Sequence, residues 1–397
     1  MTSVTAGAGR SGTPDGSAQG AKAEAAGLLH VYCRAAPAFI GAPLAEQVES
    51  SYGQLGALLA DLDVSPDDLV TERIFCRDLG RDHGDIAAIR SAFYSSCGLE
   101  GEERPAASWT QQGPCREGRD FELQAYGVAA TGTEPLDVEP VRAALPACGK
   151  VLRHGGDTHV YLSNLVAAGD TDSPFSPQCE SMFARADSLL ASQGLRFSNV
   201  VRTWLFLRDI GGDYGDLNSV RNDFFAHRGI ARFPASTGIG GGTYPVSRRC
   251  SMDLYALASE EPVDIEIMHA ETQNEAVSYG SAFSRGLKVT RHDRAILYVS
   301  GTASIDDRGR VVCPGDAEGQ LHRMFVNLES LLSSYGAHLG DLVTAVTYLR
   351  HPQYLDVFED VCAQRSIPKD MPNSVVVADV CRPEWLCEIE ATAICPA

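Results

Sequence analysis

Apolar residues recur at helical spacing in three separate stretches of this chain. The stretches run from Val48 to Leu62, from Met182 to Leu190 and from Leu321 to Leu332, with apolar residues at positions i, i+3, i+4 and i+7. This spacing places the apolar residues along one face of a helix, so each stretch predicts an amphipathic α-helix. The second and third helices are expected to close at Gly194 and Gly336.

A second pattern follows each predicted helix. A stretch rich in β-branched and aromatic residues ends on an arginine and predicts a strand. Another predicted helix comes next, then a turn of proline and small residues, then a last predicted strand. The strands that end on arginine span residues 70–77, 200–208 and 343–350; the helices begin at His83, Tyr214 and Gln353; the turns read RPAAS, FPAST and MPNSV; and the last strands read FELQAY, CSMDLY and CEIEAT.

The spacing of these patterns indicates internal repetition. The turn proline precedes one position of the last strand by 19, 19 and 18 residues (105 to 124, 234 to 253 and 372 to 390). That position holds Gln124, Asp253 and Glu390. The sequence therefore predicts three tandem copies of one α+β module, with helices on one side of each sheet.

Length and charge narrow the possible functions. With 397 residues, of which 44% are apolar, the chain can bury a sizeable core in two or three domains. The net charge of −19 argues against nucleic acid and anionic membranes as partners, because both would be repelled. A small anionic metabolite stays possible, since a local group of arginines can override the average field. Long apolar runs are absent from the sequence, so we expect no membrane span.

The N-terminal region and the cysteines predict a cytoplasmic protein without a metal. Residues 1–27 are rich in Gly, Ala, Ser and Thr and lack the apolar segment of a signal peptide, so they predict a disordered leader. The 12 cysteines form no Cys-x-x-Cys pair and mostly lie in apolar runs, which favours reduced thiols. Neither His-Glu-x-x-His nor a zinc-like Cys/His spacing occurs, so we expect no metal site.

The order of the predicted elements resembles the YjgF/RidA fold, which is also chorismate mutase-like. That family forms trimers around packed sheets and places its sites in the clefts between subunits. The resemblance implies modules over residues 28–135, 150–260 and 280–397 that form a pseudo-trimer within one chain, either as a monomer or with further self-association. The physical reason is that each sheet has an apolar face that a neighbouring module must cover.

Two positions depart from the RidA-type imine deaminases. In the turn before the last strand, that family has an arginine that holds the substrate carboxylate, whereas this chain has Ala107 or Ser108, Ser236 and Asn373. The glutamate with which the family positions a water corresponds to Glu390 and is replaced in the other two copies. We therefore expect one or two active clefts, and a reaction other than simple 2-aminoacrylate deamination.

Over roughly residues 150–397, the chain resembles the chorismatase family. The resemblance implies an enzyme without a cofactor that converts chorismate and releases pyruvate. It is carried by six segments, which are RTWLFLRDI from Arg202, FPASTGIGGG from Phe233, YGSAFSRG from Tyr279, LYVSGTASI from Leu297, PGDAEGQ from Pro314 and ADVCRPEWLCEIE from Ala378.

Glu390 is the candidate general acid. It alternates with apolar neighbours in the last predicted strand and shares a face with Glu388. In a cleft shielded from water its pKa would rise, and protonation of an enol-ether methylene near neutral pH needs such an acid. The structural alternative is an ordinary carboxylate on a solvated face.

Three arginines are the candidate groups for binding carboxylates. Arg285 follows an aromatic residue in AFSRG, and Arg202 and Arg350 lie in or at the end of central strands. Chorismate carries two carboxylates, and a planar guanidinium can hold a carboxylate by two hydrogen bonds. The alternative is that these arginines are solvated charges at the rim of the molecule.

Three further residues are candidates for contact with substrate, and Cys381 is, beside Glu390, a second candidate catalytic residue. Tyr279 can donate a hydrogen bond, and Gly240 and Gly241 lie in a glycine run that lets the backbone approach a ligand closely. Cys381 matches a cysteine that the resemblance associates with hydroxybenzoate-forming chorismatases. Plain packing for Tyr279 and Cys381, and a tight turn for the glycines, are the structural alternatives.

Three hypotheses for the function follow. The first is a chorismatase-like lyase or hydrolase that gives a hydroxybenzoate-type product and pyruvate, with a place in secondary metabolism. The second is a RidA-like enamine or imine hydrolase in a biosynthetic pathway. The third is a non-catalytic protein that binds a small acidic metabolite in its clefts. The missing turn arginine together with the YGSAFSRG segment favours the first hypothesis over the second.

Overall fold

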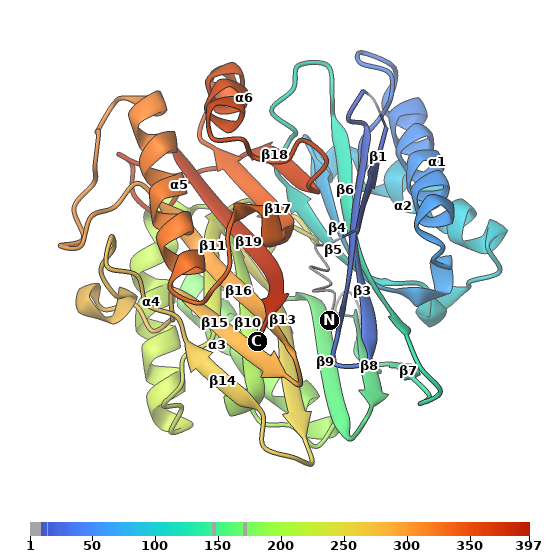
Figure 1. The fold of residues 1–397 in the computed structure, drawn as a ribbon, viewed down its shortest axis with the longest axis horizontal. Helices are drawn as coiled ribbons and strands as arrows, with labels where there is room; N and C mark the ends of the chain where they lie inside the picture. Colours follow the sequence, from blue (N-terminus) through green and yellow to red (C-terminus); the bar gives the residue numbers. More distant parts are fainter. Residues whose placement is uncertain (1–8, 14, 145–147, 170–172) are drawn as a thin grey trace, which may run out of the picture.

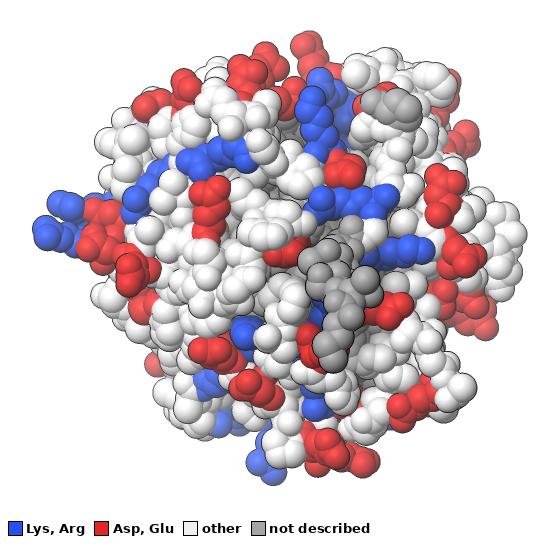
Figure 2. Space-filling view, viewed as in Figure 1, with Lys and Arg blue, Asp and Glu red and all other residues white. Residues whose placement is uncertain are grey.

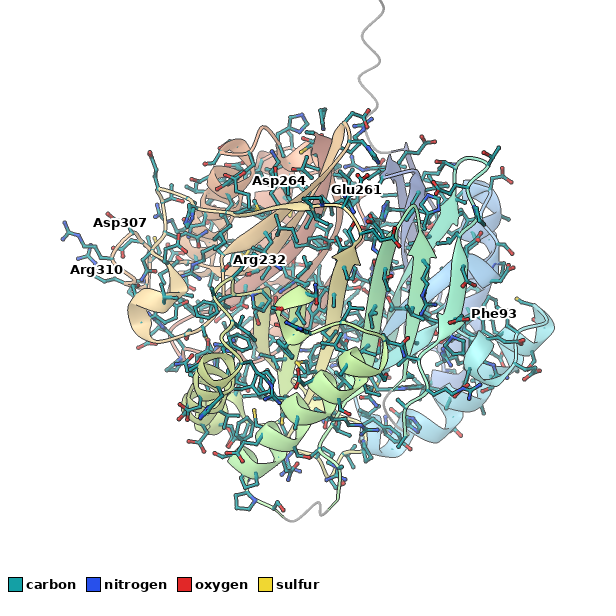
Figure 3. The ribbon with its side chains drawn as sticks, turned by 90° about the horizontal axis from the view of Figure 1, so that it is seen from below. Phe93, Arg232, Glu261, Asp264, Asp307 and Arg310 are labelled. Atoms are coloured by element: carbon teal, nitrogen blue, oxygen red, sulfur yellow. The ribbon has the colours of Figure 1, made fainter. Side chains whose placement is uncertain are left out.

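Three β-sheets stand around a common interior, and a pair of α-helices covers the outer side of each sheet (Figure 1). The computed structural model describes residues 9–13, 15–144, 148–169 and 173–397. A view from below shows the same layering, in which the helix that carries Phe93 lies on the outside of the strands (Figure 3). The prediction of an α+β fold with three tandem modules is confirmed.

Each module has the same sequence of strands and helices. In the first module these are β1 (Gly9–Gly12), β2 (Ala18–Ala25), β3 (Leu28–Ala35), α1 (Leu44–Leu62), β4 (Leu69–Cys76), α2 (Leu79–Ser96), β5 (Ala106–Gln111) and β6 (Phe121–Ala130). In the second they are β7 (Asp137–Pro140), β8 (Cys148–His154), β9 (Asp157–Leu165), α3 (Phe175–Ser192), β10 (Val200–Leu207), α4 (Ile210–His227), β11 (Ala235–Gly240), β12 (Gly242–Thr243) and β13 (Cys250–Ser259). In the third they are β14 (Asp264–Ile267), β15 (Gly286–Arg291), β16 (Arg294–Ala303), α5 (Ala317–Ser333), β17 (Leu342–Leu349), α6 (Leu355–Gln364), β18 (Asn373–Val377) and β19 (Cys387–Pro396).

The three sheets share one strand order. They read β1-β2-β3-β6-β4-β5-β12, β7-β8-β9-β13-β10-β11 and β14-β15-β16-β19-β17-β18. In each sheet the last strand of the module lies in the middle, and a parallel pair of strands follows it. The short strand β12 crosses from the second module to extend the sheet of the first, where it pairs with β5.

The register of the strands confirms the alignment of the three copies. Gln124 lies opposite Arg73, Asp253 opposite Trp204, and Glu390 opposite Val346. Two residues earlier in the same last strands stand Glu122, Ser251 and Glu388, which are therefore also equivalent positions. Two members of this second set, Glu122 and Glu388, line clefts between modules.

The inner faces of the three sheets meet in one apolar core, which makes the chain an intrachain pseudo-trimer. Residues from all three modules pack in this core and are almost completely buried. They include Ala21, Tyr32, Val70 and Val128 of the first module, Tyr161, Val201 and Tyr255 of the second, and Leu287, Tyr298, Val343 and Ile394 of the third.

The prediction of a disordered leader over residues 1–27 is wrong for the part that the structure describes. Strand β2 pairs with β3 along its whole length, from Ala18 opposite Ala35 to Ala25 opposite Leu28. Small residues are required there because α1 packs closely on this strand: a Cβ on Gly20 would lie 2.8 Å from a methyl group of Leu62. The composition that indicated disorder is thus the composition of a tightly packed strand. Residues 1–8 lie outside the described residues.

Among the described helices, none is both long and apolar enough to cross a lipid bilayer. The helices instead have one buried stripe, as the periodicity of apolar residues predicts. In α5, for example, Leu321, Met324, Leu328 and Leu331 are buried against the sheet of the third module.

Candidate functional site

A cleft between the second and third modules brings together three residues that the sequence singled out, Arg285, Tyr279 and Cys381. We call it the 2/3 cleft. It lies where β11 of one module faces β16 and β19 of the next. Its lining residues are Tyr214, Arg221, Ser236 and Gly238 from the second module and Tyr279, Phe283, Arg285, Gly301, Ala303, Ile305, Cys381, Trp385 and Glu388 from the third.

Glu388 is the acidic residue of the 2/3 cleft. The residue is 5% exposed, and within the described part of the chain its carboxylate forms no ion pair. Burial, and secondly the charge of Glu390, raise the pKa of Glu388 to about 8, although Arg285 and Arg202 act in the opposite direction. The side chain has room only because residue 301 is glycine, since a Cβ there would lie 2.0 Å from Oε1 of Glu388. The carboxyl group is therefore protonated at neutral pH.

Two buried arginines and two aromatic rings surround this carboxyl group. Arg285 is 3% exposed and is held by the backbone carbonyl of Asn274, to which its Nε donates at 2.8 Å. The guanidinium carbon of Arg285 lies 5.5 Å from the centre of the Tyr279 ring and 5.6 Å from that of Phe283. Arg221 is 2% exposed, and its guanidinium carbon lies 5.4 Å from the centre of the same Phe283 ring. The cleft thus offers two cations and one neutral acid.

Cys381 lines the 2/3 cleft as a neutral thiol. Burial, followed by the charge of Glu388, raises the pKa of Cys381 to about 12. Tyr214 from α4 lies beside it and stays a neutral phenol, because burial also raises the pKa of Tyr214. A thiol with so high a pKa is a poor nucleophile, so contact or shape, rather than covalent chemistry, is the contribution that its environment favours.

Glu390 points elsewhere, into a cavity at the centre of the pseudo-trimer. This axial cavity has a volume of about 130 Å³ and is lined by strands of all three modules. Among its lining residues are the equivalent positions Gln124, Asp253 and Glu390, together with Arg73 and Arg202.

The surroundings of Glu390 keep its carboxylate charged. Arg73 donates to it at 2.7 Å, Arg202 at 3.0 Å, and the indole Nε1 of Trp204 at 2.9 Å. Burial acts to raise the pKa of Glu390, but Arg73 and Arg202 outweigh burial, and the pKa is lowered. The expectation that its pKa rises is therefore wrong, because the sequence could not indicate that two arginines from other modules converge on it. Glu390 does not line the 2/3 cleft.

Arg202 belongs to the same axial cluster. Arg202 is 2% exposed, and its Nη2 donates to Thr237 at 2.6 Å as well as to Glu390. This arrangement occupies the guanidinium with protein groups instead of leaving it for a substrate carboxylate. Its charge still influences the cleft directly, because it acts to lower the pKa of Glu388.

Arg350, Gly240 and Gly241 line neither the 2/3 cleft nor the axial cavity. Arg350 donates to the carbonyl groups of Trp385, Val380 and Arg382 and pairs with Asp379 at 3.1 Å, so it braces the loop before β19. The glycine run lets backbones from different modules approach one another, because the N–H of Gly240 donates to the carbonyl of Asp379 at 2.8 Å. A Cβ on Gly240 would lie 2.8 Å from that same oxygen. The expectation of ligand contact is corrected for these three residues.

The structure therefore brings Arg285, Tyr279 and Cys381 together and separates them from Glu390 and Arg202. Sequence reasoning missed Glu388, Arg221 and Tyr214. The alternation of polar and apolar residues in the last strand did indicate Glu388, because it places Glu388 on the same strand face as Glu390. The alternation does not show which of the two glutamates faces the cleft. Arg221 and Tyr214 lie on α4, where they resemble the ordinary residues of an amphipathic helix.

Comparisons with known proteins agree with this architecture. Residues 275–395 match the family model described as endoribonuclease L-PSP. A 3-hydroxybenzoate synthase from Streptomyces hygroscopicus is 27% identical over 229 residues, which cover 50% of this chain and 64% of that relative. A RutC family protein from Sulfurisphaera tokodaii is 29% identical over 113 residues, which cover 28% of this chain and 86% of the relative.

A solved structure of a chorismatase has the same fold. It superposes with a TM-score of 0.61 at 17% sequence identity, covering 84% of this chain and 95% of the other. Together with the family match, this confirms the expected resemblance to the YjgF/RidA fold and to the chorismatases.

Proposed function

We propose that this chain is a cofactor-free chorismatase-like enzyme and that the 2/3 cleft is its active site. The substrate is chorismate or a related cyclohexadiene carboxylate, and the products are pyruvate and a hydroxybenzoate-type acid. One observation carries the proposal: the protonated carboxyl group of Glu388 shares a cleft with two buried guanidinium groups, those of Arg221 and Arg285. The similarities to a chorismatase and a 3-hydroxybenzoate synthase support the substrate class.

Glu388 replaces Glu390 as the general acid. It donates its proton to the methylene carbon of the enolpyruvyl group, which becomes the methyl group of pyruvate. The bond between the ring carbon and the ether oxygen breaks, the oxygen leaves as the keto oxygen of pyruvate, and the ring loses one proton as it becomes aromatic. The reaction balances without water, because the enolpyruvyl group gains one proton and the ring loses one. Glu388, ionised after the first step, can accept that ring proton and return to its starting state.

Arg285 and Arg221 bind the carboxylates of the substrate. Both are buried, so their hydrogen bonds to a carboxylate are little screened by water and hold the ring in one orientation. The free volume of the cleft is about 20 Å³, room for about one water molecule. A ring-sized substrate therefore requires the cleft to widen, and we propose that the partly exposed segment around Tyr279, which lines the cleft, moves aside. Closure behind the substrate would exclude bulk water from the protonated intermediate.

The test is to incubate the purified chain with chorismate. Pyruvate is measured with lactate dehydrogenase and the aromatic acid by mass spectrometry, for the parent chain and for the exposed-site control Glu384→Gln. We expect equal amounts of pyruvate and a hydroxybenzoate from both proteins. Formation of pyruvate without an aromatic acid would indicate a simple hydrolase instead, and no pyruvate at all would overturn the proposal.

A RidA-like enamine or imine hydrolase is the second candidate, because the matched family model covers most of the third module. Such an enzyme releases ammonia from 2-aminoacrylate, whereas the chorismate reaction releases none. A non-catalytic protein would bind chorismate in calorimetry without forming pyruvate. In every case the ligand is a small anionic metabolite, and a cytoplasmic location, a role in secondary metabolism and self-association beyond the pseudo-trimer stay predictions.

A further inference from the structure

A much larger cleft lies between the third and first modules. We call it the 3/1 cleft; its volume is about 920 Å³, within the range of small-molecule sites. One wall comes from α6 and β18, and the other from β1, β2 and the segment before β6. In Figure 2, Lys and Arg side chains gather on the face of the molecule between the regions of α6 and β1 in Figure 1.

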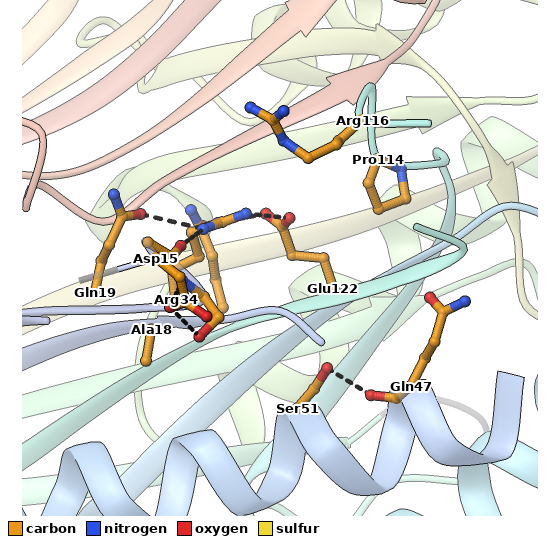
Figure 4. Close-up of polar contacts among 12 residues, drawn as sticks. Asp15, Ala18, Gln19, Arg34, Gln47, Ser51, Pro114, Arg116 and Glu122 are labelled. Atoms are coloured by element: carbon orange, nitrogen blue, oxygen red, sulfur yellow. Dashed lines mark hydrogen bonds and ion pairs between the residues drawn. The ribbon is translucent and has the colours of Figure 1, made fainter. Parts of the chain in front are cut away.

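The 3/1 cleft is equivalent to the 2/3 cleft in the repeat but carries different chemistry. Glu122 occupies the position of Glu388, and Asn373 that of Ser236. Unlike Glu388, Glu122 is bound on both oxygens by Arg34, whose Nε donates to it at 2.7 Å (Figure 4). Both oxygens are occupied by this arginine, so this cleft lacks the free acid of the 2/3 cleft.

Arg119 is the unusual residue of the 3/1 cleft. The residue is 9% exposed, and among the described residues its side chain has no hydrogen-bond or ion-pair partner, with Nε buried and unsatisfied. Burial, and then the nearby charge of Arg34, lower the pKa of Arg119 despite the presence of Glu122 and Asp15. By contrast, the neighbouring Arg116 is 41% exposed and is paired with Glu359. A buried arginine without a partner is costly and indicates a missing anion.

We propose that the 3/1 cleft binds a small organic carboxylic acid and that Arg119 holds its carboxylate. The apolar side chain of Ile40, which is 57% exposed, and that of Leu355 line the same cleft and offer contact to an apolar ligand body. An apolar wall beside a buried guanidinium selects an organic acid over an inorganic anion. This site is separate from the 2/3 cleft, and its existence does not depend on the function proposed there.

The experiment is calorimetric titration of the full chain with benzoate. It is performed in the Arg285→Ala background, so that binding in the 2/3 cleft is weakened and contributes less to the signal. We expect Arg119→Gln to weaken binding at least about tenfold and Arg119→Lys to recover part of it, while the control Arg153→Gln, at an exposed arginine outside the cleft, should stay within about twofold. Equal binding by Arg119→Gln and its parent would overturn the proposal. So would tighter binding of inorganic phosphate than of benzoate, because the site would then be a general anion site.

Thermal melting separates a ligand-binding role of Arg119 from a structural one. Because the free chain buries an unpaired charge, Arg119→Met is expected to melt at a higher temperature than the parent. Benzoate should raise the melting temperature of the parent and leave that of Arg119→Met unchanged. A lower melting temperature for Arg119→Met would mean that the arginine serves the fold, and would contradict the proposal.

Discussion

Glu388 and Glu390 lie two residues apart on β19 and are equally buried, at 5% exposure, yet their pKa values move in opposite directions. Glu390 faces the axial cavity, where Arg73 and Arg202 hold it as a carboxylate. Glu388 faces the 2/3 cleft, where it has no ion-pair partner among the described residues and keeps its proton to about pH 8. Burial alone therefore does not decide the charge of a carboxyl group; the partners within hydrogen-bonding distance do.

Glu388 and Glu390 therefore have different roles. A neutral acid with a pKa near neutrality can give a proton to a substrate, whereas a carboxylate bound by two arginines cannot. Glu390 instead joins strands from three modules through its contacts with Arg73 and Arg202. Substitution of Glu388 should consequently lower the rate of pyruvate formation, and substitution of Glu390 should lower the free energy of unfolding.

The largest effect is expected from Glu388→Gln, which preserves shape and removes the proton. We expect kcat for pyruvate formation to fall by about a hundredfold to ten-thousandfold, as for the loss of a general acid. The substitution should not destabilise the folded chain. Because the pKa of Glu388 is raised in the folded state, folding at pH 7 must protonate a carboxylate that is ionised in the unfolded chain, and glutamine removes this free-energy cost. The melting temperature should equal or exceed that of the parent. Retained activity would show that the acid lies elsewhere.

Glu390→Gln should reverse this pattern. Removal of the charge leaves Arg73 and Arg202 buried without their shared partner, which costs about 3–5 kcal/mol of the free energy of unfolding. Urea denaturation measures this loss. The substitution also removes a charge that raises the pKa of Glu388, so the alkaline limb of the pH–rate profile should move to lower pH. A Glu390→Gln variant that is as stable as the parent but inactive would contradict the structural role of Glu390.

Arg285→Ala should have an intermediate effect. It removes a charged hydrogen-bond donor from the cleft and should weaken chorismate binding by about 1.5–3 kcal/mol. Arg285→Lys should recover only part of the affinity, because lysine keeps the charge but loses the planar fork. The control is Arg310→Ala, whose side chain is 67% exposed and points away from the molecule (Figure 3). Affinities are measured by calorimetry on a Glu388→Gln background, where substrate is not consumed. Unchanged binding by Arg285→Ala would place the substrate outside the cleft.

Cys381→Ser should have the smallest effect. The thiol has a pKa of about 12 and is almost entirely in the neutral form at pH 7, so it supplies no nucleophile. We expect kcat to change little and iodoacetamide to leave the enzyme active, as measured by pyruvate release. A complete loss of activity in the serine variant would indicate covalent chemistry at this position.

Much of the fold was predictable because local pattern and repetition point to the same answer. The helical stripes, the strands that end on arginine and the equivalence of Gln124, Asp253 and Glu390 all appear as expected. The error at the N-terminus arose because the small residues of β2 resemble a disordered segment in composition. Their packing against α1 depends on a contact that composition does not reveal.

The site was predictable only in part, since it depends on contacts between modules. Arg285, Tyr279 and Cys381, which the sequence singled out one by one, line the same cleft. The choice between Glu388 and Glu390 was not accessible, because alternation places both on one face of the strand. What separates them is the position of Arg73, more than 300 residues away in the chain, which pairs with one of them.

The most direct test of the account is a titration of the two carboxyl groups by carbon NMR. The chain is labelled with 13C at the glutamate side-chain carboxyl carbon, and spectra of the parent are compared with those of Glu388→Gln and Glu390→Gln between pH 4 and pH 9. We predict one resonance that titrates near pH 8, is absent in Glu388→Gln, and shifts to a lower pKa in Glu390→Gln. If the resonance of Glu388 titrates below pH 5, the carboxyl group is ionised at neutral pH and the assignment of the general acid is wrong.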